Sequence, residues 1–312
     1  MKILIVGAGA IGRLFGALLS RGGNDVILLE KREEVVSAIN RNGIGLLEFG
    51  VEDPDAVTII PVRATTNAAE ITACDLVILA VKSFDTREAL APVAHLASTG
   101  SAFLTVQTGI GNIRVMESLV PKNAILGGYT FMAATELGVS HVKHGGAGKT
   151  VIGELDGSIS DRIRSIADTF TACGIETEIS PSIHTMIWKK VIVLSAINPL
   201  TALLQVPNGF LLEHMESVSL MKRLIDEAAA AAEARSIVLR VDELYDTLFE
   251  TLKRTAGNLS SMLQDILEER RTEIDSQNGA ICRYARERGL PACTHETIVD
   301  LVRLAEKHGR RE

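Results

Sequence analysis

Short apolar runs alternate with helix-like segments over the first half of the chain. Apolar runs rich in valine and isoleucine occur at residues 3–6, 26–29, 76–81 and 102–106, and an apolar-rich segment typical of a helix lies at 11–20. The runs are continuous and do not alternate with polar residues, as in strands that are buried on both faces of a parallel sheet. Strand–helix–strand alternation therefore predicts a doubly wound α/β domain.

The pattern changes along the second half of the chain. A glycine-rich segment from Gly127 to Gly157 contains several β-forming residues, and we expect it to add strands and hairpins to the sheet. After Pro181, strand-like runs become scarce. The stretch 225–234 is dense in strong helix formers, and 263–285 has apolar positions at helical spacing amid charges. The second half is therefore predicted to be all-helical.

Length and composition agree with two globular domains. The chain has 312 residues, and a domain has roughly 150. We place the α/β domain at residues 1–180 and the helical domain at 181–312. Hydrophobic residues make up 46% and charged residues 23%, which is ordinary globular usage. A net charge of −7 and only 4% aromatic residues argue against nucleic acid as a partner.

The cysteines and the N-terminal sequence indicate in which cellular compartment the protein resides. Four cysteines are scattered without a C-x-x-C pair, which indicates a reducing compartment and no cysteine-rich zinc site. No signal peptide is evident, and no uninterrupted apolar run approaches the roughly 18–20 residues needed to cross a bilayer. We therefore expect a cytoplasmic protein without a membrane partner.

One motif near the N-terminus has the form G-x-G-x-x-G and consists of Gly7, Ala8, Gly9, Ala10, Ile11 and Gly12. It follows a predicted strand and opens a predicted helix, which is the context that the dinucleotide fingerprint requires. Gly7 permits a tight turn, Gly9 allows close approach of the backbone to a pyrophosphate, and Gly12 allows close helix–strand packing. The N–H groups at the helix N-terminus favour the phosphates.

The end of the second strand normally contacts the ribose of a bound dinucleotide. Here it carries a negative charge at Glu30 and a positive charge at Lys31. Glu30 is suited to the ribose hydroxyls of NAD, whereas the adjacent cation Lys31 is suited to the 2′-phosphate of NADP. A solvated run of charges is the simpler alternative. The local sequence leaves the choice of cofactor open.

A second polar constellation lies in an otherwise apolar helix. Lys190, Leu194 and Asn198 fall on one face, four residues apart. Pro199 cannot donate to the carbonyl of Ser195, so we expect the helix to kink or break there. Polar residues beside a freed carbonyl indicate the wall of a site. The alternatives are a snorkelling surface lysine at 190 and a cap at Asn198.

Further polar candidates have competing structural explanations. Ser261 with Gln264 matches the S-x-x-Q capping box, so helix capping rivals a role in binding. Glu273 is either functional or simply solvated. His141 and His144 are spaced H-x-x-H, but no carboxylate stands at a telling interval, and two surface histidines are expected rather than a metal site.

Taken together, these segments resemble the ketopantoate reductase family (2-dehydropantoate 2-reductases) over nearly the whole chain. Seven stretches carry the resemblance in order, namely the glycine motif, Ala80-Val81-Lys82-Ser83, Trp188-x-Lys190, Ile197-Asn198-Pro199-Leu200-Thr201, Pro207-Asn208-Gly209, Ser260-Ser261-Met262 and Thr272-Glu273-Ile274-Asp275. The resemblance implies reduction of ketopantoate to pantoate, in pantothenate biosynthesis, with NADPH bound to the Rossmann domain. It also implies an active site in the cleft between the two domains.

The resemblance assigns roles to individual residues. Lys190 would be the general acid, and Glu273 would help to hold the lysine and the substrate. Asn198, Asn208 and Ser261 would contact the substrate. Lys82 would lie near the cofactor, and Lys31 would stand where the family has its cation for the 2′-phosphate.

Two departures from the family pattern bear on the substrate. Thr108 occupies the place of an asparagine that touches cofactor and substrate, and a hydroxyl lacks the reach of an amide. Leu194 occupies the place of a second asparagine one turn after the lysine. The alternatives are a reductase of a different 2-oxo acid or a non-catalytic dinucleotide sensor. Because of Glu30, NAD(H) remains an alternative to NADP(H) as the cofactor. The family resemblance also leads us to expect a homodimer.

Overall fold

The computed structural model describes residues 1–53 and 55–309. The chain forms two compact units. The first comprises Met1–Gln107 and Asn112–Ile183, and the second comprises Thr108–Gly111 and the chain from His184 onward. Residues 108–111 thus belong with the second unit, although they lie in the first half of the sequence.

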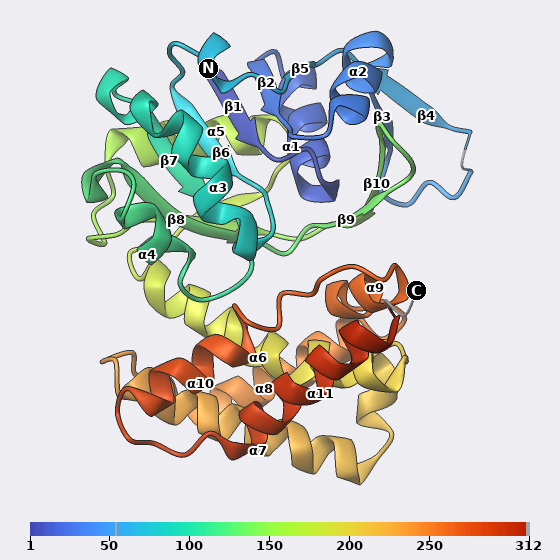
Figure 1. Ribbon diagram of the computed structural model, residues 1–312, viewed down its shortest axis with the longest axis vertical. Coiled ribbons are helices and arrows are strands. Elements are labelled where there is room, and N and C mark those ends of the chain that lie inside the picture. Colours follow the sequence, from blue (N-terminus) through green and yellow to red (C-terminus); the bar gives the residue numbers. More distant parts are fainter. Residues whose placement is uncertain (54, 310–312) are drawn as a thin grey trace. The chain divides into compact units, whose positions relative to one another are not determined.

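An eight-stranded sheet forms the centre of the first unit (Figure 1). Its order is β12 (Thr177–Ile179), β11 (Thr150–Glu154), β8 (Ile125–Thr130), β7 (Ala102–Thr105), β6 (Leu76–Leu79), β1 (Lys2–Val6), β2 (Asp25–Leu29) and β5 (Arg63–Thr65). Neighbouring strands are parallel except β8 and β11. The four apolar runs of the sequence form β1, β2, β6 and β7, so the doubly wound α/β prediction is confirmed.

Both faces of this sheet are buried. Ile3 and Ile5 join the apolar cluster on one face, while Leu4 and Val6 join the cluster on the other. The helices of the first unit are α1 (Ala10–Arg21), α2 (Glu33–Asn42), α3 (Thr86–Leu90), α4 (Asn112–Glu117) and α5 (Asp161–Ala172). Figure 1 shows α3 in front of the sheet and α5 behind it. Burial on both faces explains why the strands carry continuous apolar runs.

A second, four-stranded sheet corrects one expectation. Its order is β4 (Val57–Ile60), β3 (Ile44–Leu47), β10 (His141–Gly146) and β9 (Ala133–Glu136). The glycine-rich segment therefore adds β8 and β11 to the main sheet, as expected, but the prediction is wrong for β9 and β10. Leu46 of β3 and Val142 of β10 pack into the same apolar cluster as α1, so the second sheet shares a core with the first.

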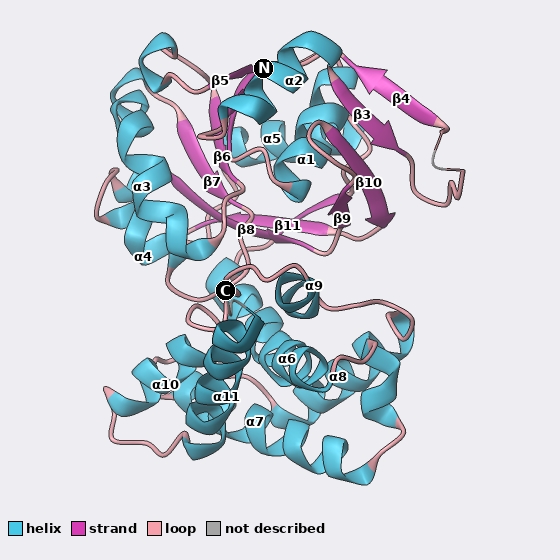
Figure 2. Cartoon of the chain, turned by 45° about the vertical axis from the view of Figure 1, so that its right-hand side comes forward, coloured by secondary structure: helices cyan, strands magenta, loops and turns pink. Residues whose placement is uncertain are grey.

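The described part of the second unit beyond His184 contains helices and loops but no strand (Figure 2). Its helices are α6 (Ile183–Leu204), α7 (Met215–Glu233), α8 (Val241–Arg254), α9 (Ser261–Leu267), α10 (Asn278–Arg286) and α11 (Cys293–Gly309). The all-helical prediction is confirmed, but the stretch 263–285 is not one helix. Glu269 adopts a left-handed conformation with φ of 53° just after α9, and the chain is non-helical until α10.

Helix α6 is long and apolar enough to cross a membrane by length and composition. Its most apolar 18-residue window is 72% buried within the folded chain, as in a core helix. The helix continues through Pro199, so it does not break there, and the kink stays a prediction. The carbonyl of Ser195, which Pro199 leaves without its helical donor, accepts a hydrogen bond from Asn278 Nδ2 at 2.9 Å. This bond satisfies the freed carbonyl and lets the helix continue.

Candidate active site

The glycine-rich turn joins β1 to α1 at the carboxyl end of the strand. A Cβ on Gly12 would lie 1.9 Å from Gly7 O, so only glycine fits there. No described side chain caps the N-terminus of α1, and its first N–H groups suit an anion. Because β1 lies between β2 and β6, this edge is the point at which the strand order reverses, where such sheets bind ligands. The turn therefore fits the pyrophosphate of a dinucleotide.

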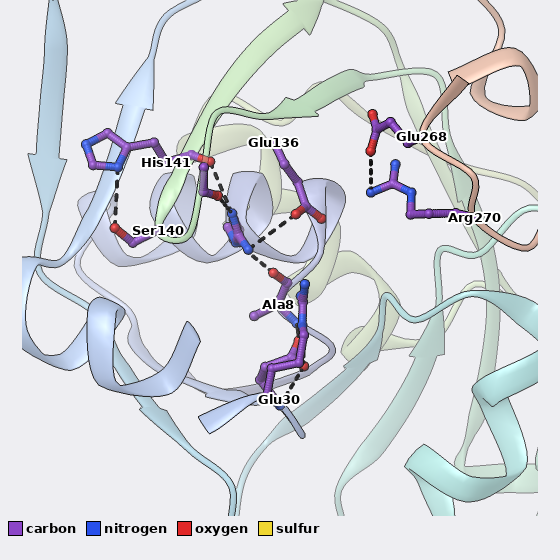
Figure 3. Close-up of polar contacts among 10 residues, drawn as sticks. Ala8, Glu30, Glu136, Ser140, His141, Glu268 and Arg270 are labelled. Carbon is purple, nitrogen blue, oxygen red and sulfur yellow. Dashed lines mark hydrogen bonds and ion pairs between the residues drawn. The ribbon is translucent and has the colours of Figure 1, made fainter. Parts of the chain in front are cut away.

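Glu30 follows β2 and is buried beside this turn (Figure 3). Its Oε2 accepts from Ala8 N at 2.9 Å, and its Oε1 accepts from Arg32 N and Nε, both at 3.0 Å. Burial raises the pKa of Glu30, but the hydrogen bonds from Arg32 and Ala8 outweigh burial and hold the pKa below its usual range. The carboxylate is therefore ionised and paired with Arg32. Of the two cations that follow Glu30, Arg32 and not Lys31 makes the described contacts with its carboxylate.

The two lysines expected near a cofactor follow neighbouring strands. Lys31 comes after β2, and its side chain is 69% exposed with Nζ 3.6 Å from Asp85 Oδ1. Lys82 follows β6 and is half-buried. Since β2 and β6 both pair in parallel with β1, both lysines follow strand ends at the same edge of the sheet as the glycine turn.

Arg13 is a buried cation in the apolar helix α1. Its side chain is 1% exposed, and Nε donates to Ala8 O at 2.7 Å. The guanidinium also donates to Gly138 O at 2.7 Å and lies 3.4 Å from Glu136 Oε2. Glu136 is adjacent to the glycine turn, because a Cβ on Gly9 would lie 3.6 Å from its Oε1. Arg13 thus ties the turn to the β9–β10 hairpin and balances the charge of a carboxylate beside it.

Lys190 lies in α6 and is half-buried. Burial lowers the pKa of its amine from 10.5 to about 8, and the charge of Glu273 opposes this shift. The amine is therefore unlike that of a solvated surface lysine, which was the alternative explanation. A lysine whose pKa lies near neutrality is suited to proton transfer.

Asn198 lies two turns beyond Lys190 on the same face of α6, with half-buried Leu194 between them. Asn198 is 4% exposed, and its Nδ2 donates to Gln277 Oε1 at 3.1 Å. The alternative that Asn198 caps a broken helix is wrong, because the helix continues to Leu204.

The segment that carries Glu273 is anchored at both ends. Thr272 N and Oγ1 donate to Glu306 Oε1 at 2.7 and 2.6 Å, and Arg303 pairs with Asp275 at 2.6 Å. Beyond the turn, Asn278 bonds to the Ser195 carbonyl of α6. Glu273 itself is half-buried, and its charge acts on Lys190. The anchored backbone keeps this carboxylate near the lysine-bearing helix.

Thr108 begins a short turn that belongs to the second unit. Ile110 N donates to Ser276 O at 2.8 Å, so the turn is attached to the segment that carries Glu273. Thr108 is half-buried. Sequence reasoning singled out Thr108 by the family pattern alone, since the contact of its turn with Ser276, 166 residues after Ile110, has no local signal.

Two remaining candidates lie on neighbouring segments of the same unit. Asn208 is 8% exposed, and its Nδ2 donates to Thr255 Oγ1 at 2.9 Å, while no described donor reaches its buried Oδ1. Ser261 is exposed in the first turn of α9. The capping expectation for Ser261 is wrong by one residue, because Ser260 Oγ accepts the capping bond from Leu263 N at 3.1 Å.

The histidines of the H-x-x-H pair are not both on the surface. His144 is 8% exposed beside Phe49, with ring centroids 5.6 Å apart, so the expectation is wrong for this residue. Burial lowers the pKa of His144. Among the described residues, no group of three or more histidine, cysteine or acidic side chains is arranged to hold a metal ion.

The residues expected to bind the cofactor and those expected to bind the substrate belong mostly to different units. The glycine turn, Lys31 and Lys82 belong to the first unit. The polar residues expected around a substrate belong to the second, namely Thr108, Lys190, Asn198, Asn208, Ser261 and Glu273. The first unit is therefore equipped for a dinucleotide, and the second for acid–base chemistry on a small polar molecule.

Two family models match this chain. The model described as "Ketopantoate reductase PanE/ApbA" matches residues 3–157, and that described as "Ketopantoate reductase PanE/ApbA C terminal" matches residues 182–306. Curated relatives cover the whole length. The 2-dehydropantoate 2-reductase of Pyrococcus abyssi is 39% identical over 97% of each chain. That of Halobacterium salinarum is 32% identical over 99% of this chain and 100% of its own.

Solved structures are similar over the full chain. A ternary structure of D-mandelate dehydrogenase with NADH and anilino(oxo)acetate has a TM-score of 0.93 at 27% identity, with 100% of both chains covered. A PanE/ApbA family ketopantoate reductase from Ralstonia eutropha has a TM-score of 0.89 at 29% identity, again with 100% of both chains covered.

Proposed function

The chain is an oxidoreductase of the ketopantoate reductase family, and from this premise we propose that it reduces 2-dehydropantoate to pantoate with NADPH. The observation that carries the proposal is the half-buried Lys190, whose amine has a pKa of about 8 and is acted on by Glu273. Reduction of a ketone needs a group that stabilises and protonates the developing alkoxide, and an amine with this pKa is suited to that role. The pantoate product makes this a step of pantothenate biosynthesis.

The first unit fits a pyridine nucleotide. Its glycine turn, Gly7, Ala8, Gly9, Ala10, Ile11 and Gly12, would hold the pyrophosphate at the uncapped N-terminus of α1. Lys31 would pair with the 2′-phosphate of the cofactor. Lys82 and Thr108 would also contact the cofactor. When bound, the reduced nicotinamide supplies the hydride.

In the proposed mechanism, Lys190 is the general acid. Negative charge develops on the 2-oxo oxygen during reduction, and a nearby ammonium stabilises this charge and then donates its proton to the oxygen. At a pKa of about 8, the amine is mostly protonated at neutral pH and still releases its proton readily. Glu273 opposes the effect of burial and keeps the ammonium form populated.

Four polar residues of the second unit are proposed to hold the substrate, namely Thr108, Asn198, Asn208 and Ser261. The buried Oδ1 of Asn208 supports this role, because a buried acceptor without a described donor favours a ligand that donates. Asn198 supports it through its place on the same helix face as Lys190.

NADPH is proposed over NADH on the charges at the end of β2. Arg32 neutralises Glu30 by direct contacts, which lowers the repulsion that this carboxylate would exert on a 2′-phosphate. Lys31 adds an exposed cation. NADH is the alternative, because Glu30 still stands where a ribose hydroxyl would be read.

A second candidate function is reduction of a different 2-oxo acid. The D-mandelate dehydrogenase structure supports it, as does Leu194, which places an apolar side chain beside Lys190. A substrate with a larger apolar group next to its oxo carbon would pack well against the Leu194 side chain.

The function is tested by steady-state oxidation of NADPH, and separately of NADH, with ketopantoate, 2-oxoisovalerate and phenylglyoxylate. We expect the highest kcat/KM for ketopantoate with NADPH, with pantoate identified as the product. A preference for phenylglyoxylate would favour the second candidate. Absence of turnover with all three acids would contradict both.

A cytoplasmic location is proposed on the four cysteines, Cys74, Cys173, Cys282 and Cys293, all of which are free thiols in the structure. The homodimer stays a prediction from the family.

A further inference from the structure

Gln277 is a buried residue at the start of α10 that no motif of the sequence marks. It is 1% exposed, and its Oε1 accepts the hydrogen bond from Asn198 Nδ2 at 3.1 Å. The two residues are 79 positions apart in the chain. Gln277 therefore acts directly on a residue of the proposed substrate site without belonging to that site.

The surroundings of Gln277 fix its position. Its backbone N donates to Glu273 O at 3.2 Å, and the next residue, Asn278, donates from Nδ2 to Ser195 O and lies 3.1 Å from His295 Nδ1. His295 Nε2 contacts Leu224 O at 2.8 Å. The start of α10 is thus held against α6 at two consecutive residues, and Gln277 Oε1 has little freedom to leave Asn198.

This contact decides which atom Asn198 presents to a ligand. A carboxamide has a donating NH2 group on one side and an accepting oxygen on the other. Because the Nδ2 side faces Gln277, the Oδ1 side remains for other partners. An acceptor of this kind selects a ligand group that donates, such as a hydroxyl, and disfavours a carboxylate or a ketone oxygen.

Three side chains along α6 then form a polar–apolar–polar series. Lys190, Leu194 and Asn198 lie on one face, about 6 Å apart along the helix axis at each step. Ketopantoate has a matching order of groups, since its oxo group is followed by a dimethyl carbon and then by a terminal hydroxyl. For the oxo group to meet Lys190 and the hydroxyl to meet Asn198, the long lysine side chain must reach along the helix past Leu194 toward Asn198, because only one carbon separates the two groups of ketopantoate.

We propose that Gln277 is a positioning residue that holds the Asn198 oxygen toward the substrate and so selects 2-oxo acids with a hydroxyl beyond a branched carbon. This inference rests on the proposed function, because it takes Asn198 as a residue that contacts the substrate. It adds a specificity determinant outside the residues that touch the substrate.

The test compares two substrates that differ by one group. Trimethylpyruvate is ketopantoate without its terminal hydroxyl, so the ratio of kcat/KM for the two acids measures recognition of that hydroxyl. In Gln277→Met, which keeps the length but removes the acceptor, the ratio should fall about tenfold, the effect of one neutral hydrogen bond. The loss should appear in KM for ketopantoate, while kcat and KM for NADPH stay unchanged.

Two further variants separate positioning from folding. Gln277→Glu keeps an accepting oxygen and should retain the wild-type ratio within about threefold. Gln264→Met makes the same replacement in α9, where Gln264 donates to Leu259 O, and should leave both substrates unaffected. If Gln277→Met does not accumulate as folded protein, Gln277→Asn, whose amide is one carbon shorter, carries the same expectation.

The outcomes are distinct. An unchanged ratio in the folded Gln277 variant, or an equal loss for both acids, would overturn the inference and leave the proposed function standing. A wild-type enzyme that reduces neither acid would overturn the proposed function and this inference together.

Discussion

Replacement of Glu273 by glutamine is expected to move the pH dependence of reduction without abolishing it. The charge of Glu273 raises the pKa of Lys190 against the effect of burial. Glutamine has nearly the same shape but no charge, so the amine would lose its proton at a lower pH. The alkaline limb of the wild-type profile should therefore shift to lower pH in Glu273→Gln.

The structure sets the magnitude for the wild type. A lysine pKa of about 8 in place of 10.5 corresponds to about 3 kcal/mol of lost preference for the ammonium form. With that pKa, about 90% of the amine is protonated at pH 7 and about 10% at pH 9. Activity that depends on the ammonium should fall about tenfold over this range. An unshifted lysine would show almost no change.

The assay is kcat/KM for ketopantoate at saturating NADPH between pH 6 and pH 10, because this parameter reports the ionisation of the enzyme before the acid binds. Lys190→Arg, whose guanidinium stays charged over the range, is the matched variant without an alkaline limb from this residue. A wild-type profile that stays flat to pH 10 would refute the reasoning. So would an unmoved limb in Glu273→Gln.

Three other predictions concern stability and the cofactor. Lys190→Met should raise the free energy of unfolding at pH 7 by on the order of 2 kcal/mol in urea titrations, because the unfolded lysine binds its proton more tightly than the folded one. This gain in stability should shrink as the pH rises from about 8 toward 10.5. An unchanged free energy of unfolding at pH 7 would contradict the prediction. Glu30→Gln should raise the NADPH-to-NADH ratio of kcat/KM, and Lys31→Ala should lower it, with an unchanged ratio in both variants as the contrary result. Glu136→Gln should lower KM for NADPH, since it removes a negative charge next to Gly9; a higher KM would oppose this reasoning.

Features that depend on local sequence were predictable. The glycine turn follows from residue spacing between one strand and one helix. The parallel sheet follows from continuous apolar runs, because burial on both faces leaves no polar side of a strand. Lys190 stood out because it shares one face of an apolar helix with Asn198, and because the family pattern Trp188-x-Lys190 marks it.

Features that depend on distant partners were not predictable from one sequence. Pro199 removes a donor from α6, and the side chain of Asn278, 83 residues after Ser195, supplies one in its place. Gln277 has no signal of its own, because its role depends on Asn198. The capping prediction for Ser261 was wrong by one residue. Ser260 and Ser261 offer the same capping chemistry, and the extended backbone of Ser260 makes it the cap.

Lys190→Ala tests the proposed chemistry most directly. NADPH binding, followed by the fluorescence of the reduced nicotinamide, should be unchanged, because this residue belongs to the second unit and the glycine turn to the first. Turnover of ketopantoate should fall by roughly 10²–10⁴-fold, the usual contribution of general acid catalysis. A Lys190→Ala enzyme that binds NADPH and keeps a kcat near that of the wild type would contradict the assignment of Lys190 as the proton donor.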